Sequence, residues 1–134
     1  MEKKLFYLFI AIGGAAGALL RYFMSVWLND KIATAFPIGT LVVNLLGSFL
    51  LGLIYSISMK FIMPVEIVRA LVMVGFLGAF TTFSTFSLET FLLIYEGSFA
   101  LAFLNVLTNL LGGFVAVFLG ISATNLINAM RGLM

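Results

Sequence analysis

Residues 75–87, GFLGAFTTFSTFS, decide how the third apolar segment of this chain can fold. Two glycines, Gly75 and Gly78, precede a run in which five of seven residues carry a hydroxyl group. The apolar segment around them extends from about Glu66 to Tyr95. A straight helix of that length would reach about 45 Å, whereas the hydrocarbon core of a bilayer is about 30 Å thick. The segment must tilt strongly, protrude or break, and we predict a break near its middle, within residues 75–82.

The rest of the chain has the composition of a membrane protein. Of its 134 residues, 63% are hydrophobic and 9% are charged, whereas an average soluble domain is about half apolar and about a quarter charged. A membrane-spanning helix needs roughly 20 apolar residues. Four such segments fill the chain, so we expect an all-α membrane protein with one domain, residues 1–134. Its helices would cover about 5–28, 37–59, 66–95 and 98–127, with Asn29-Asp30-Lys31 as the first polar turn.

Four spans place both termini on one side of the membrane. The side of the termini would carry five basic residues and the opposite side two: Lys3, Lys4, Lys60, Arg69 and Arg131 against Lys31 and Arg21. The positive-inside rule therefore favours cytoplasmic termini.

The sequence also excludes several kinds of chemistry. Cysteine and histidine are absent, which excludes disulfides, Cys/His metal sites and catalysis by either residue. Glu89 is the only carboxylate expected near mid-membrane, so no nucleophile–base pair can be assembled and we expect no enzyme. The basic residues do not cluster as a nucleic-acid surface requires.

Polar residues fall on one face of the second span and one face of the fourth. They are Thr40, Asn44, Gly47 and Ser48 in the second, and Asn105, Thr108, Asn109 and Gly112 in the fourth. Each set alone is explained equally well by helix packing, in which small and amide side chains join neighbouring helices. Together they carry three asparagines, which favours a lined pathway for an anion or a polar solute.

Phe83 and Phe86, three residues apart, share a helix face beside the predicted break. The edge of an aromatic ring is positive, so two ring edges could favour an anion without a buried cation. The alternative is a kinked helix with phenylalanines in its core. A break would also free backbone carbonyls at membrane depth, and these are ligands for a small cation.

Three stretches resemble the Fluc (CrcB) family of fluoride channels, and the resemblance covers nearly the whole chain. They are residues 13–22 (GGAAGALLRY), 39–49 (GTLVVNLLGSF) and 75–89 (GFLGAFTTFSTFSLE), of which the last is the most specific. The resemblance implies an antiparallel dimer with two fluoride pores along the subunit interface. It implies passive export of fluoride from the cytoplasm across the plasma (inner) membrane of a prokaryote, which relieves fluoride toxicity. The partner would be a second copy of a chain that inserts in both orientations, or else an oppositely oriented paralogue. The five-to-two bias in basic residues does not decide between these two alternatives.

The same resemblance implies roles for individual residues. Phe83, Phe86 and Asn44 would line the fluoride pore, with Thr82, Ser84 and Thr85 in a polar track nearby and with Asn105 and Asn109 where the family often has tyrosine and serine. Gly78 and Thr81 would offer backbone carbonyls to a structural sodium ion at the dimer two-fold axis. Arg21 would gather anions at a pore vestibule or extend to the membrane interface. Glu89 matches the third-helix glutamate of the family, and Thr40 is a further polar residue. Considered by itself, Glu89 would be a helix-interface hydrogen-bond partner or a vestibule group, or else a proton-linked carboxylate.

Two other functions stay open. A proton-coupled exporter of the small multidrug-resistance type also has four short helices, but it needs a buried acidic residue in its first helix. The first span has none between Glu2 and Asp30. A non-transporting accessory subunit could be held together by the same glycines and asparagines.

Overall fold

The computed structural model describes residues 2–60 and 65–131, and the four predicted spans are all helical there. Helix α1 covers Lys3–Ile32, α2 covers Ile38–Lys60 and α6 covers Phe99–Arg131. The third span consists of α3 (Val65–Val68), a π-helical stretch η1 (Arg69–Leu77), α4 (Gly78–Phe80) and α5 (Phe83–Tyr95). No strand occurs within these described ranges. The ends of the expected domain, residue 1 and residues 132–134, lie outside them.

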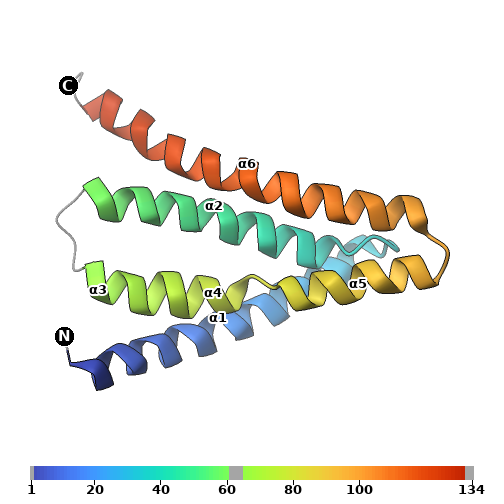
Figure 1. Ribbon diagram of the computed structural model, residues 1–134, viewed down its shortest axis with the longest axis horizontal. Helices are drawn as coiled ribbons and strands as arrows, with labels where there is room; N and C mark the ends of the chain where they lie inside the picture. Colours follow the sequence, from blue (N-terminus) through green and yellow to red (C-terminus); the bar gives the residue numbers. More distant parts are fainter. Residues whose placement is uncertain (1, 61–64, 132–134) are drawn as a thin grey trace.

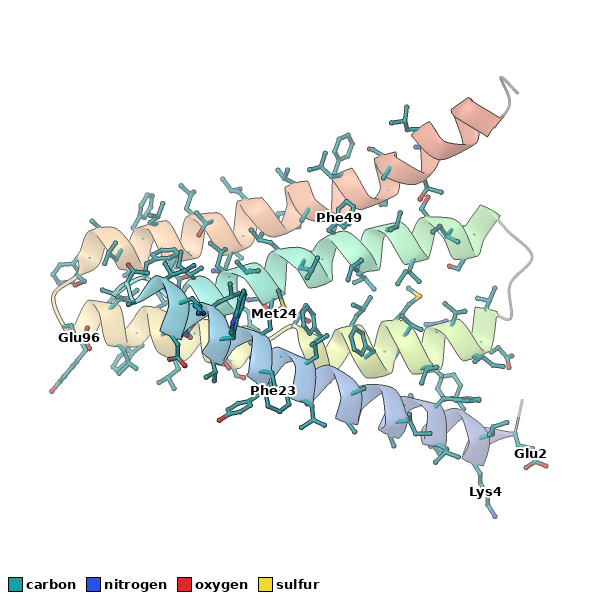
Figure 2. The ribbon with its side chains drawn as sticks, turned by 180° about the vertical axis from the view of Figure 1, so that it is seen from behind. Glu2, Lys4, Phe23, Met24, Phe49 and Glu96 are labelled. Carbon is teal, nitrogen blue, oxygen red and sulfur yellow. The ribbon has the colours of Figure 1, made fainter. Side chains whose placement is uncertain are left out.

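Four helical segments are long and apolar enough to cross a membrane: Lys3–Ile32, Ile38–Met59, Val65–Tyr95 and Phe99–Leu126. The prediction of an all-helical protein with four such segments is confirmed. Both termini lie at the same end of the bundle (Figure 1), as an even number of spans requires. Figure 2 shows Glu2 and Lys4 at that end and Glu96 at the opposite end.

The first polar turn was placed wrongly. Residues 29–31 belong to the last turn of α1, where Lys31 interacts favourably with the negative end of the helix dipole. The helix ends at Ala33, which has the left-handed conformation (φ 44°, ψ 52°) and donates its N–H to Asn29 O. Polar side chains at the membrane surface do not by themselves stop a helix, because water can solvate them there.

The helices pack mainly as two pairs, and the two pairs contact each other. α2 lies along α6, and α1 lies along η1 and α4 (Figure 1). Gly13 and Gly17 are buried where α1 contacts η1, and a Cβ at either position would overlap the η1 backbone. Gly52 and Gly120 have the same role between α2 and α6. Such close backbone approach is the usual way in which helices associate in a bilayer.

The outward faces of the helices are apolar. Phe103, Phe114 and Phe118 on α6 are 69%, 75% and 68% exposed, and Phe23 on α1 projects away from the bundle (Figure 2). A face of this kind suits lipid or another apolar helix surface.

The third span bends at Thr81 and Thr82. Their backbones are extended (φ −83°, ψ 156° and φ −148°, ψ 117°), and helix resumes at Phe83. Gly75 and Gly78, which suggested the break, both lie within helical structure. Gly75 is buried because its missing side chain lets α1 approach at Ile10 and Gly13. The bend therefore falls at the two threonines, at the C-terminal end of the predicted range 75–82.

Candidate functional site

A cavity of about 280 Å³ lies beside the bend, between α2, the third span and α6. Its wall is formed by Asn44, Gly47, Ser48 and Leu51 of α2, Met73, Leu77, Gly78, Thr81, Thr82, Phe83 and Phe86 of the third span, and Asn109 and Leu110 of α6. The structure thus brings together most of the expected pore residues and both expected cation-binding residues. Ser84, Thr85, Asn105, Arg21, Glu89 and Thr40 lie outside this wall.

Thr82 begins helix α5 and organises the hydroxyl groups around it. Its Oγ1 accepts a hydrogen bond from the Thr85 N–H at 3.2 Å, the usual contact of a threonine N-cap. The same oxygen donates to Thr85 Oγ1 at 3.0 Å and lies 3.3 Å from Ser84 Oγ. Three of the expected polar-track hydroxyls are therefore bonded to one another at the start of the helix.

The two phenylalanines occupy different environments. Their ring centroids are 5.5 Å apart, with 56° between the ring planes. Phe83 is 74% exposed, whereas Phe86 is 7% exposed. Both rings contribute to the cavity wall. The Phe83 ring is largely exposed, whereas the Phe86 ring forms a buried part of the wall.

Asn44 binds the backbone of the bend. Its Oδ1 accepts from the Thr82 N–H at 2.8 Å, and its Nδ2 donates to Thr82 O at 3.2 Å. In a continuous helix, the Thr82 N–H would bond to the carbonyl four residues earlier, at Gly78. A carboxamide from α2 therefore replaces the helical partner that the bend removes.

A directional chain of hydrogen bonds runs from Asn44 to helix α5. Asn44 Nδ2 donates to Asn109 Oδ1 at 2.9 Å, and Asn109 Nδ2 donates to Asn105 Oδ1 at 2.9 Å and to Asn105 O at 3.0 Å. Asn105 Nδ2 donates to Thr90 Oγ1 at 2.9 Å, and Thr90 Oγ1 donates to Phe86 O at 2.8 Å. The chain links the bend, α2 and α6 to the residue that carries the buried ring.

In this arrangement the side-chain N–H groups of Asn44 and Asn109 are occupied by hydrogen bonds within the protein. Asn44 uses both N–H groups on Thr82 O and Asn109 Oδ1, and Asn109 uses both on Asn105. Asn105 is 0% exposed and lies outside the cavity wall. The sequence argument missed Thr90, although its position four residues after Phe86 was the signal that could have found it.

Arg21 also contacts the bend. It is half-buried, and its Nε donates to Ala79 O at 3.1 Å. A continuous helix would pair that carbonyl with the Phe83 N–H. Neither expected role, at a vestibule or at the membrane interface, included this contact. Arg21 and Asn44, from two different helices, thus bind an acceptor and a donor that the bend leaves without helical partners.

Glu89 joins α5 to the start of α2. Thr40, which is buried, donates its hydroxyl to Glu89 Oε1 at 2.7 Å. The other oxygen, Oε2, is buried and has no hydrogen bond to any residue that the structure describes. Glu89 therefore accepts a hydrogen bond between α5 and α2, with Thr40 as its donor.

Gly78 and Thr81 are the residues expected to bind a small cation, and both line the cavity. Gly78 is exposed, and its carbonyl lacks the usual helical donor because the Thr82 N–H is bonded to Asn44. No group of three His, Cys, Asp or Glu side chains comes together within residues 2–59 and 65–126, whose side chains the structure describes. A cation at the bend would therefore depend on backbone carbonyls, and a free carbonyl on an exposed glycine fits a hard cation.

Comparison with known proteins adds a family match. Residues 8–121 match the family model described as "CrcB-like protein, Camphor Resistance (CrcB)". A protein of Shewanella woodyi named "Fluoride-specific ion channel FluC" is 50% identical over 113 residues, which are 84% of this chain and 90% of that protein. Proteins of the same name from Magnetococcus marinus and Geotalea daltonii are 49% and 46% identical over 118 and 120 residues. These matches cover 88% and 90% of this chain and 96% and 97% of the two proteins.

Proposed function

This chain belongs to the CrcB-like family of membrane channels, and from that membership we propose that it is a fluoride-selective ion channel. The family consists of ion channels and not enzymes. The observation that carries the proposal is the joint position of Phe83 and Phe86 in the wall of one cavity, beside neutral polar groups at the bend.

A fluoride ion holds its water tightly, so a pore must replace that water with donors and still release the ion. Charged side chains would bind it too strongly. Hydroxyl groups and the positive edges of aromatic rings suit this compromise. The cavity wall is uncharged: its polar side chains belong to asparagine, serine and threonine.

Transport would be passive and directed outward. Hydrogen fluoride, a weak acid, crosses a membrane uncharged and dissociates inside the cell. A membrane potential that is negative inside drives an anion out, by about 2.3 kcal/mol per charge for each 100 mV. An open path for the anion is then enough to relieve fluoride toxicity, without coupling to a second ion. The similarity to bacterial proteins supports the inner membrane of a prokaryote as the location.

The working unit would be an antiparallel dimer with two pores along its interface. Phe83 is largely exposed in the single chain, and a second copy would enclose it. The bend at Thr81 and Thr82 would be the family's break in the third helix. The partner would be an identical chain, or else a paralogue of opposite orientation.

A sodium ion would bind between the two bends. The backbone carbonyls of Gly78 and Thr81 would hold it, and it would supply a fixed positive charge at the centre of the dimer. The exposure of Gly78 and the diversion of the Thr82 N–H to Asn44 support this site.

The test is fluoride efflux from liposomes that contain the purified protein, measured with a fluoride electrode and with chloride as the control anion. We expect rapid fluoride release and no chloride release, unchanged between an acidic and a neutral bath. If no fluoride is released by the protein alone, and none after it is reconstituted together with a paralogue, the channel proposal is refuted. The hypothesis of a non-transporting accessory subunit would then replace it. Flux that requires a proton gradient would indicate a coupled exporter.

A further inference from the structure

Ser48 differs from the other polar residues of the cavity wall because it has no hydrogen bond. It lies near the middle of α2, one helical turn after Asn44, and it is half-buried. Ser48 contributes to the cavity wall, and its Oγ lies on the side of α2 that faces Gly113 of α6. No described residue donates a hydrogen bond to this oxygen or accepts one from it. An unpaired hydroxyl at membrane depth is costly unless it meets water or an ion.

The other side-chain donors of the wall are already used. Both N–H groups of Asn44 and both of Asn109 are bonded within the protein. Thr81 Oγ1 donates to Leu77 O at 3.0 Å, and Thr82 Oγ1 donates to Thr85 Oγ1 at 3.0 Å. Ser48 is therefore the one polar side chain of this wall whose proton has no acceptor among the residues that the structure describes.

We propose that the Ser48 hydroxyl donates a hydrogen bond to fluoride as the ion passes the two phenylalanine rings. This inference rests on the proposed channel function and adds a binding residue to it. The asparagines then have a different role: Asn44 and Asn109 hold the bend and the cavity wall in shape, and Ser48 contacts the anion. A hydroxyl can rotate its proton toward the ion and away again, so it adds a donor without a fixed charge.

The variant Ser48→Ala separates this role from a structural one. Because the hydroxyl has no partner in the described part of the chain, its removal leaves no group there unsatisfied, and folding should be unchanged. Because a hydrogen bond to an ion is stronger than one between neutral groups, fluoride efflux should fall by about tenfold, with saturation at a higher fluoride concentration. Size-exclusion profile and thermal unfolding in detergent are measured on the same preparation.

Ser58→Ala is the matched control. Ser58 is on the same helix, but its hydroxyl donates to Tyr55 O at 2.8 Å and it lies outside the cavity wall. Its efflux should equal that of the unmodified protein. Efflux from Ser48→Ala equal to that of the control would overturn the inference. Loss of folded Ser48→Ala protein would also overturn it, because the hydroxyl would then have a structural partner. Absence of fluoride efflux from the unmodified protein would instead refute the proposed function itself.

Discussion

At the scale of single residues, the two phenylalanines show how tertiary structure separates identical side chains. Both lie beside the bend in one helix turn, and nothing in the sequence distinguishes them. In the structure Phe83 is 74% exposed and Phe86 is 7% exposed. The backbone carbonyl of Phe86 also accepts a hydrogen bond from Thr90, which in turn accepts one from Asn105. One ring is thus free to meet an ion or a partner, and the other is also part of the packed core.

We therefore predict different effects for Phe83→Ala and Phe86→Ala. Both should abolish fluoride efflux, because each removes a ring edge from the pathway. Phe86→Ala should also destabilise the protein by about 3–5 kcal/mol, as expected for a large buried side chain. Phe83→Ala should destabilise it much less. Efflux and denaturant unfolding of both variants are the measurements, and normal efflux through either one would remove the rings from the mechanism.

At the scale of elements, the bend is stabilised from outside its own helix. Arg21 of α1 binds Ala79 O, and Asn44 of α2 binds both backbone groups of Thr82. Thr82 itself caps the helix that follows. A buried backbone group without a partner costs free energy comparable to a lost hydrogen bond. Two neighbouring helices and the Thr82 cap therefore stabilise the bend at this position.

The variant Thr90→Val tests the chain that joins these elements. It keeps the side-chain shape but leaves Asn105 Nδ2 and Phe86 O without this hydroxyl, so unfolding free energy should fall by about 1–3 kcal/mol. Thr90→Ser retains the hydroxyl and should lose less. Thr108→Val is the control, because Thr108 Oγ1 donates only to Leu104 O and Asn105 O of its own helix. Equal stability of Thr90→Val and Thr108→Val would show that the chain contributes nothing.

At the scale of the whole molecule, apolar residues cover the outside and the polar network lies within. Phenylalanines project from α6, while Asn105 and Thr40 are buried. This distribution reverses that of a soluble protein and follows from a solvent that cannot hydrogen-bond. The charged residues Glu2, Lys4 and Glu96 lie at the two ends (Figure 2), where water and headgroups can solvate them.

Orientation in the membrane can be measured directly because the chain contains no cysteine. Glu2→Cys and Glu96→Cys mark opposite ends of the bundle and leave the Lys/Arg count unchanged. An antiparallel homodimer inserts in both orientations, so we expect an impermeant thiol reagent to label both variants on intact cells. Cysteine-free protein is the control. Labelling of Glu96→Cys alone would show a fixed orientation with cytoplasmic termini and would require an oppositely oriented partner chain.

The sequence determined the architecture of this protein because the bilayer imposes simple rules. Hydropathy and length placed four spans, with errors of a few residues at their ends, such as the polar residues 29–31 that continue α1. The stretches around Asn44 and residues 75–89 also identified the family. Spacing on one helix face brought Asn44 and Ser48 to the same side of α2, where the structure places both in one cavity wall. These features depend on local periodicity, which one sequence contains.

The tertiary structure decided which polar groups are bonded to one another and which are free. The sequence could not show that Asn44 binds the Thr82 backbone, that Thr90 completes a chain to Phe86, or that Ser48 has no partner. Nor did it show which residues of the predicted range 75–82 form the bend, or that Gly75 serves a helix contact instead. Each of these depends on a pair of residues far apart in the sequence. A hydrogen bond requires its donor and acceptor within about 3 Å of one another, and only the folded chain fixes that distance.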